Sequence, residues 1–242
     1  MSQLEGTLTV YADAAALADG VAAWLTDLAT AKGDIFTVCL SGGSTPKRLY
    51  ERLAQSPYRE QFPWAKTHFF FGDERFVPAD NKDNNFRMAR DALLAHVPVP
   101  DANVHPVNTA RPTAEDAAVD YERTLRDFYG SGHLDPDRPL FDVMFLGLGP
   151  DGHTASLIPG EPILEERQKW VGSVAHGRPE ARITLTYPVL ESSANIAFLI
   201  TGSEKTPMMR AARAGDTAIP AGRLQTMGHV VWFADEAAAG GQ

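Results

Sequence analysis

The sequence is poor in cysteine, in long apolar runs and in targeting features. A single cysteine, Cys39, excludes an internal disulfide framework and is consistent with a reducing compartment. No run approaches the ~20 apolar residues of a membrane span, and the N-terminal residues lack the basic and apolar regions of a signal peptide. We therefore expect a cytoplasmic protein in which Cys39 packs as a small apolar residue.

Positive charge is also scarce, since 22 Lys and Arg stand against 31 Asp and Glu and leave a formal net charge of −9. Proteins that bind nucleic acids hold the phosphate backbone with clustered Lys and Arg, and this sequence has no long basic run. The seven histidines show no close metal-ligand spacing such as HExxH. These absences argue against nucleic-acid, membrane and metal partners, so an anionic ligand must be held by a local site.

What is present indicates an ordinary folded domain. Of the 242 residues, 44% are hydrophobic and 22% are charged. A chain of this length buries roughly 70–75% of its unfolded surface. Without repeats or low-complexity linkers, we expect residues 1–242 to form a single domain.

Apolar runs alternate with helical patterns along almost the whole chain, which is typical of parallel strands joined by crossover helices. The predicted fold is α/β: a three-layer, doubly wound, mostly parallel sheet with helices on both faces and one or two antiparallel edge strands. The tail from residue 234 onward is expected to fray. We expect strands over 7–11, 35–40, 68–71, 141–148, 170–175, 183–186, 195–200 and 229–233, and helices over 12–32, 45–54, 86–96, 112–129 and 204–214.

Ligands of open α/β sheets bind at the carboxyl ends of the strands, so the turns after the apolar runs are the places to search. The first unusual turn contains Gly42, Gly43, Ser44 and Thr45 before a predicted helix. Its glycines permit close backbone approach, and the hydroxyls and free helix N–H groups suit a phosphate. The alternative is a tight turn with a Ser/Thr cap. The spacing matches neither a P-loop nor a nucleophile elbow.

The second turn, GLGPDGHT at residues 147–154, has the GxGxxG spacing of a dinucleotide site. Pro159 cuts short the helix that such a site requires, so we reject a dinucleotide cofactor. What remains is Asp151 two residues before His153, where the imidazole can act as general acid or base and the carboxylate can orient it. A histidine that merely satisfies its loop is the alternative.

Two further turns carry charge at strand ends. In Gly72–Arg75 (GDER), the charges form either a solvated salt-bridge cluster or a carboxylate pair and a guanidinium facing a substrate. In TGSEK, Lys205 lies in the first turn of a predicted helix, where a cation is unfavourable for the helix dipole. It is either a tolerated surface residue or a cation retained for an anion at that N-terminus.

The order of SGGSTP, GDER, GLGPDGHTASLIPG, RITLTYP and TGSEK resembles that of the 6-phosphogluconolactonase family, which shares a fold and ancestry with glucosamine-6-phosphate deaminases. The resemblance extends from about Leu8 to Phe233. It implies a Rossmann-like, glucosamine-6-phosphate deaminase-like fold. It also implies hydrolysis of the ring ester of 6-phospho-D-glucono-1,5-lactone to 6-phosphogluconate in the oxidative pentose phosphate pathway. The resemblance implies no metal or organic cofactor, and we expect a monomer or weak dimer.

The same resemblance implies roles for individual residues. His153 is the general base that activates water, and Asp151 orients it or holds the water. Asp73 faces the ring end of the substrate. Arg75 stabilises the developing oxyanion, with backbone N–H groups of the 149–152 loop as rivals. The substrate phosphate is bound by Gly42, Gly43, Ser44, Thr45, Arg182 and Lys205.

Two alternative functions belong to other classes. The related deaminases pair the DGH histidine with a Glu seven residues after the Asp of that motif, and this chain has Ile158 there. Without that carboxylate, the proton transfers of ring opening and amine loss lack a partner. A non-catalytic sugar-phosphate sensor is the other alternative, and we expect a sensor to carry a basic DNA-binding module, which this sequence does not show.

Overall fold

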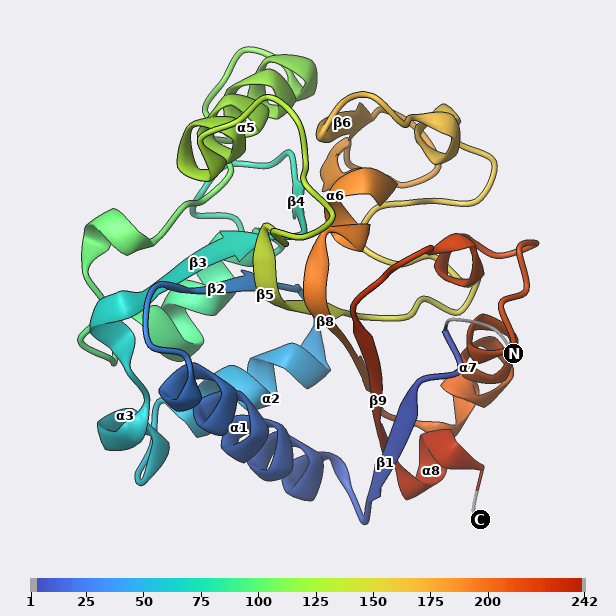
Figure 1. The fold of residues 1–242 in the computed structure, drawn as a ribbon. Helices are drawn as coiled ribbons and strands as arrows, with labels where there is room; N and C mark the ends of the chain where they lie inside the picture. The colour runs from blue at the N-terminus through green and yellow to red at the C-terminus, as the bar shows by residue number, and fades with distance from the viewer. Residues whose placement is uncertain (1–3, 241–242) are drawn as a thin grey trace.

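Six parallel strands form the central sheet of the computed structural model, which describes residues 4–240 (Figure 1). Their order across the sheet is β1-β9-β8-β5-β2-β3, and every pairing is parallel. All six carboxyl ends therefore lie along one edge of the sheet. The strands are β1 Thr7–Tyr11, β2 Phe36–Leu40, β3 Thr67–Phe71, β5 Phe141–Leu146, β8 Ser193–Ile200 and β9 His229–Asp235.

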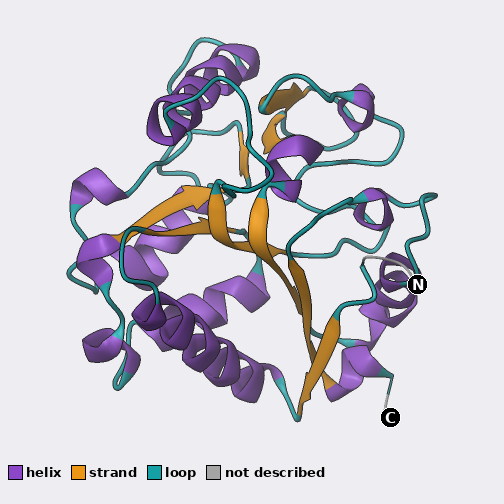
Figure 2. Ribbon diagram, viewed as in Figure 1, coloured by secondary structure: helices purple, strands orange, loops and turns teal. Residues whose placement is uncertain are grey.

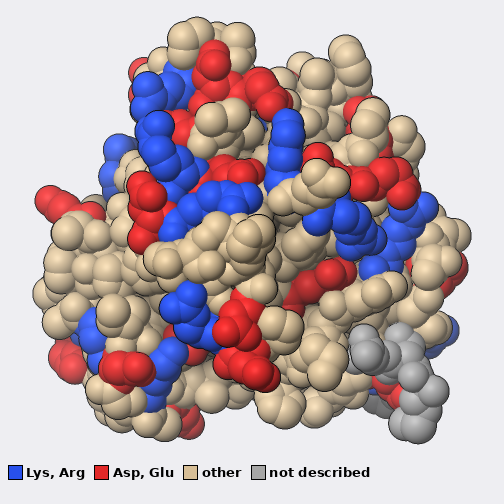
Figure 3. Space-filling view, turned by 45° about the horizontal axis from the view of Figure 1, so that its top comes forward, with Lys and Arg blue, Asp and Glu red and all other residues tan. Residues whose placement is uncertain are grey.

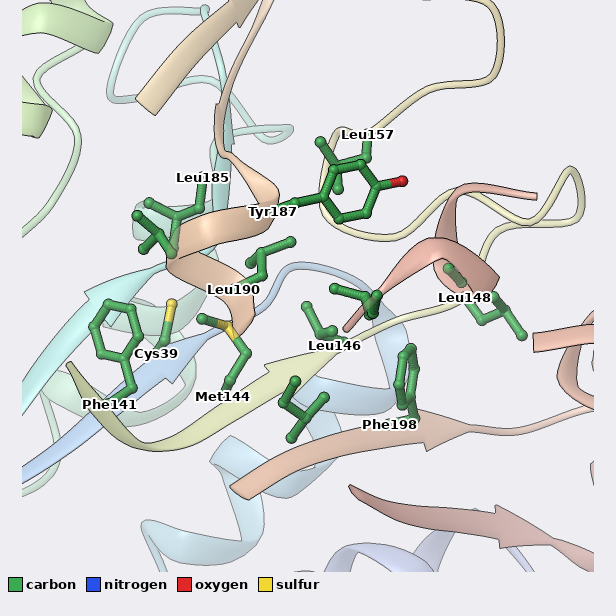
Figure 4. Packing of buried hydrophobic residues seen from close by; sticks show 14 of the residues in the cluster. Cys39, Phe141, Met144, Leu146, Leu148, Leu157, Leu185, Tyr187, Leu190 and Phe198 are labelled. Atoms are coloured by element: carbon green, nitrogen blue, oxygen red, sulfur yellow. The ribbon is translucent and has the colours of Figure 1, made fainter. Parts of the chain in front are cut away.

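The central strands are apolar at nearly every position because both faces of the sheet are covered. Alternate side chains of β5 enter two separate cores: Met144 and Leu146 pack on one face, Val143 and Phe145 on the other. Cys39 of β2 is fully buried in the first core, as expected. Figure 4 shows this core, where side chains of α6 lie over the sheet.

Helices cover both faces of the sheet, which confirms the predicted three-layer architecture (Figure 2). Leu17, Val21 and Leu25 of α1 are buried in the second core, as their spacing predicts. Among residues 4–240, no helix combines the length and apolar character that a membrane span requires. The helices are α1 Ala14–Ala31, α2 Ser44–Leu53, α3 Tyr58–Gln61, α4 Asn85–Ala89, α5 Ala114–Tyr129, α6 Tyr187–Glu191, α7 Thr206–Arg213 and α8 Glu236–Ala239.

The antiparallel strands do not extend the main sheet, contrary to the prediction. They form a separate sheet of β4 Asp73–Arg75, β7 Arg182–Leu185 and β6 Val171–Val174. Segment 175–181 between β6 and β7 is too short for a parallel crossover, so these two strands pair antiparallel. The Gly72 N–H donates to the Leu40 carbonyl at 2.9 Å, and the Leu185 N–H donates to the Gly72 carbonyl at 2.9 Å. The small sheet is thereby tied to the carboxyl end of β2.

Two other predictions need correction. The helix expected over 86–96 is α4 followed by a π-helical segment, Arg90–Leu94. The tail expected to fray forms α8, in which Ala238 and Ala239 are buried and Asp235 caps the helix through the Ala238 N–H. Apolar alanines that reach a core fix the chain end, which composition alone did not reveal. Residues 241 and 242 of that tail lie outside the described residues.

Two stacked histidines, His68 of β3 and His105, lie away from the turns that carry the motifs. The His68 Nδ1 and His105 Nε2 atoms are 3.0 Å apart, and the His105 ring stacks on Phe70 with centroids 4.3 Å apart. Burial, with a smaller contribution from His68, lowers the pKa of His105 to about 4, and burial also lowers the pKa of His68. Both rings are therefore neutral in the folded protein at pH 7.

We predict that this pair makes the fold acid-sensitive. As the pH falls, the histidines bind protons in the unfolded chain before they do so in the folded protein. The contribution of the neutral pair to the free energy of unfolding is therefore complete above pH ~6.5 and is lost as the pH falls toward 4. His105→Phe should reduce the loss of unfolding free energy between pH 7.5 and 5.0 by on the order of 1 kcal/mol, a figure discounted for partial exposure of the rings. Urea unfolding at both pH values measures it. Equal losses in the variant and the wild type would contradict the prediction.

Candidate active site

A cavity of about 410 Å³ opens where the carboxyl ends of β2, β5 and β8 meet the small antiparallel sheet. All of the predicted site residues line it except Asp151. The parallel sheet brings together the turns after its strands, and the small sheet adds side chains of β4 and β7. Lining residues from the predicted set are Gly42, Gly43, Ser44, Thr45, Asp73, Arg75, His153, Arg182 and Lys205.

The turn after β2 presents the N-terminus of α2 to this cavity. Gly43 has φ 109°, a conformation that favours glycine, and α2 begins at the next residue, Ser44. No side chain among residues 4–240 caps this helix end. The Thr45 hydroxyl is 2.8 Å from that of Thr201, which joins this turn to the one that holds Lys205. Uncapped N–H groups beside a lysine make a site suited to an anion.

Two guanidinium groups line the same cavity from the small sheet. Arg75 and Arg182 are directly opposed in the β4–β7 pairing. The Nε atom of each is buried and has no hydrogen-bond partner in the described part of the chain. Burial, and next the charge of Arg75, lowers the pKa of Arg182. An anionic ligand in the cavity would relieve the repulsion between the two guanidinium groups.

His153 lines the cavity and is held by Asp151. The His153 Nδ1 lies 2.5 Å from Asp151 Oδ1, so an ionised Asp151 accepts a hydrogen bond from Nδ1–H and leaves Nε2 to exchange a proton with a ligand. Gly149 has to be glycine here, because a Cβ atom on it would lie 2.0 Å from His153 Nδ1. The structure thus brings the two motif residues together in the arrangement that a general base requires.

Arg178, which sequence reasoning missed, completes this group. Its Nη2 atom donates to Asp151 Oδ2 at 2.7 Å and lies 3.0 Å from His153 Nδ1. Partial burial acts to raise the pKa of Asp151, but hydrogen bonds from Arg178 and His153 outweigh it and hold that pKa well below its usual range. Arg178 lies in the 175–181 loop, where no motif marks it.

Asp73 lies in the cavity wall within a buried polar network. Its Oδ2 accepts a hydrogen bond from the Ser156 hydroxyl at 2.7 Å, and its Oδ1 accepts one from the Asn85 amide at 3.3 Å. Sequence reasoning did not single out Ser156 or Asn85, although Ser156 follows His153 by three residues in the same motif. Both fix the direction in which the carboxylate of Asp73 points.

The interpretation of GDER as a carboxylate pair facing a substrate is wrong for Glu74. Its side chain is fully buried and does not line the cavity. It accepts hydrogen bonds from the backbone N–H groups of Arg75, Asn85 and Phe86 at 2.8, 2.7 and 2.9 Å. Burial raises the pKa of Glu74 to about 7 despite these bonds. Glu74 therefore anchors the start of α4 to β4 and places Asn85 against Asp73.

Other surfaces of the molecule offer weaker sites. A groove of about 840 Å³ runs beside α2, but four of its charged residues pair with one another: Lys47 with Glu51 at 2.7 Å and Arg87 with Asp91 at 3.5 Å. On the face drawn in Figure 3, Lys and Arg are interspersed with Asp and Glu rather than gathered into one broad basic surface. Within residues 4–240, no group of three or more His, Cys, Asp or Glu side chains is arranged to hold a metal ion.

Comparisons with known proteins agree with this geometry. The family model of glucosamine-6-phosphate isomerases/6-phosphogluconolactonase matches residues 12–232. The chain is 42% identical to 6-phosphogluconolactonase 3, chloroplastic, of Arabidopsis thaliana over 84% of this chain and 64% of that protein. It is 41% identical to a 6-phosphogluconolactonase of Synechocystis over 84% of this chain and 82% of that protein. The chain thus spans less than two thirds of the plant relative.

Solved structures support the same assignment. The 6-phosphogluconolactonase of Thermotoga maritima is 34% identical, with a TM-score of 0.78 over 94% of this chain and 97% of that one. Together with the family match over nearly the whole length, this confirms the resemblance drawn from the motifs. The chain belongs to the glucosamine-6-phosphate isomerase/6-phosphogluconolactonase family.

Proposed function

We propose that this chain is a single sugar-phosphate lactonase domain that hydrolyses 6-phospho-D-glucono-1,5-lactone to 6-phosphogluconate in the oxidative pentose phosphate pathway. One observation carries the proposal: the Asp151-held His153 lies in the same cavity as the uncapped N-terminus of α2, Lys205 and Arg182. A general base beside an anion site suits a small ester with a phosphate handle. The similar names of the relatives support it.

The phosphate end of the substrate does not react, and its binding positions the lactone. Backbone N–H groups at Ser44 and Thr45, with the Lys205 ammonium and the Arg182 guanidinium, bind the phosphate oxygens. Binding energy gained there holds C1 of the lactone beside His153, which turns a reaction with water into a nearly unimolecular step.

Hydrolysis then needs one proton taken and one returned. His153 Nε2 accepts a proton from water as the water oxygen attacks C1, and Asp151 stabilises the imidazolium that forms. The bond between C1 and the ring oxygen breaks, and His153 returns the proton to that oxygen. The new carboxylic acid ionises and releases a proton to solvent. Asp73, in the cavity wall, faces the ring end of the substrate.

Arg75 is the group that stabilises the negative charge on the carbonyl oxygen. The rival donors in the 149–152 loop are largely engaged: the Gly149 N–H donates to the His153 carbonyl at 2.8 Å, and the Gly152 N–H donates to the Gly149 carbonyl at 3.0 Å. Pro150 has no N–H. Arg75 lines the cavity, and although its Nη1 donates to the Asp83 carbonyl at 2.6 Å, its guanidinium has further N–H groups and supplies the missing donor.

The deaminase alternative lacks its acidic group in this structure. Ile158, at the position of the deaminase carboxylate, is 3% exposed and belongs to the apolar core rather than to the cavity wall. Deamination moves protons among the ring oxygen, C2 and the amine, whereas lactone hydrolysis moves one proton out and back.

We place the protein in the cytoplasm as a monomer or weak dimer, with the lactone as its partner.

We predict that His153→Ala lowers kcat by ~10²–10⁴-fold, the usual contribution of one general acid/base. The measurement is proton release from freshly generated 6-phosphogluconolactone, corrected for spontaneous hydrolysis. His133→Ala, an exposed loop histidine, is the matched control and should keep wild-type rates. If purified, folded His153→Ala turned over the lactone nearly as fast as the wild type at pH 7, the general-base role would be wrong.

Lys205→Ala should act on binding, because the phosphate is held but does not react. Loss of a charge-assisted hydrogen bond of ~1.5–3 kcal/mol lowers kcat/KM by roughly 10–150-fold. The unphosphorylated gluconolactone serves as the comparison substrate, and its kcat/KM should not change. Lys47→Ala, which removes an exposed lysine of α2 outside the cavity, is the matched control. Equal losses on both lactones would show that Lys205 does something other than bind phosphate.

A further inference from the structure

The Asp151 carboxylate is engaged at both oxygens: Oδ1 accepts from the backbone N–H of His153 at 3.2 Å and lies against the His153 ring, and Oδ2 accepts from Arg178. His153 Nδ1 lies 2.5 Å from Oδ1, and Arg178 Nη2 lies 2.7 Å from Oδ2. The two donor nitrogens are themselves 3.0 Å apart. Arg178 does not line the cavity, although His153 does. Whatever Arg178 contributes to the reaction therefore passes through Asp151 and His153.

We propose that Arg178 is a positioning residue that fixes the Asp151 carboxylate and limits the proton affinity of His153, so that the imidazole releases its proton readily to the departing ring oxygen. This inference rests on the proposed function. Arg178 belongs to the 175–181 loop between β6 and β7. The small antiparallel sheet therefore contributes to the surroundings of the general base as well as to the phosphate end of the cavity.

Two physical effects oppose each other at His153. The carboxylate of Asp151 favours the imidazolium, while the guanidinium of Arg178, close to the same ring nitrogen, disfavours it. With Arg178 present, Asp151 stays ionised and aligned, but its charge is divided between two cations. The Asp151 carboxylate therefore stabilises the imidazolium that forms during attack. The nearby Arg178 limits this stabilisation, so that the imidazolium can still give its proton to the ring oxygen.

The orientation of Asp151 depends on the same contact. A carboxylate on a glycine-flanked loop, with 37% of its side chain exposed, has rotational freedom unless both oxygens are engaged. The Arg178 guanidinium bonds the far oxygen and also donates to the Gly177 carbonyl at 2.7 Å, which fixes the arginine to its own loop. Removing it leaves His153 with a less ordered partner.

The first test measures kcat and KM from pH 5 to 8 for Arg178→Met and Arg178→Lys. Arg178→Met should lower kcat roughly 10-fold at pH 7, leave KM within about 2-fold, and move the acid limb of kcat/KM upward by about 0.5–1 pH unit, because a nearby positive charge is gone. Arg178→Lys, which keeps the charge, should keep the acid limb near its wild-type position.

The matched control is His176→Ala, an exposed residue in the same loop. It should leave kcat, KM and the acid limb unchanged. The other charged groups of the cavity are the same in all of these variants, so the shift reports on residue 178 alone; they are Asp73, Arg75, Arg182, Glu204 and Lys205. A lower kcat at every pH without a shift would make Arg178 a loop tether only, and a raised KM without a shift would make it a substrate ligand. Either result overturns the proposal.

A second measurement does not depend on the reaction. The imidazole of His153 can be titrated by ¹H–¹⁵N NMR without substrate, its signals being assigned by their loss in His153→Gln. The midpoint should rise by about 0.5–1 pH unit in Arg178→Met and stay in place in Arg178→Lys and His176→Ala. An unmoved midpoint in Arg178→Met would refute the inference. If the wild type failed to hydrolyse the lactone, the proposed function would fall while this titration still decided the role of Arg178.

Discussion

Parallel pairing of β2, β5 and β8 is the constraint on which the site depends, because it brings three strand ends to one edge of the sheet. The turns that follow these strands carry the uncapped start of α2, the Asp151–His153 pair and Lys205. A one-residue slip in β5 would exchange Met144 for Val143 between the two cores and turn every later side chain to the wrong face. The register that buries the apolar residues therefore also places the site residues in the turns at one edge of the sheet.

The small antiparallel sheet supplies cavity side chains that the turns of the parallel sheet do not provide. Hydrogen bonds through Gly72 tie it to the end of β2, so Asp73 and Arg75 of β4 and Arg182 of β7 face the turns of the main sheet. Its two cations are only partly compensated: Arg182 pairs with Glu180 at 3.6 Å, and the Nε atoms of Arg75 and Arg182 are buried without a hydrogen-bond partner among residues 4–240. Two guanidinium groups held this close are costly in the free protein and suit an anionic ligand, although the chain as a whole is acidic.

The strands, the main helices and the motif turns could be predicted from the sequence because apolar periodicity and glycine turns are local features. Glu74 was misjudged because GDER was treated as a turn; as a strand, its period of two places Asp73 and Arg75 on the cavity side and Glu74 on the other. Arg178 could not be predicted, since its contact with Asp151 depends on how the 175–181 loop folds back over residues far away in the sequence. The tail was misjudged for a similar reason, because the core that receives Ala238 is distant in sequence.

We propose that this cavity opens a phosphorylated lactone and does not deaminate an amino sugar. The most direct measurement gives the wild-type protein freshly generated 6-phosphogluconolactone and, in parallel, millimolar glucosamine 6-phosphate over hours. We expect proton release from the lactone well above the spontaneous rate and no ammonia from the amino sugar, because Ile158 provides no acidic partner for His153. Steady ammonia release above a His153→Ala control, with lactone opening only at the spontaneous rate, would contradict it.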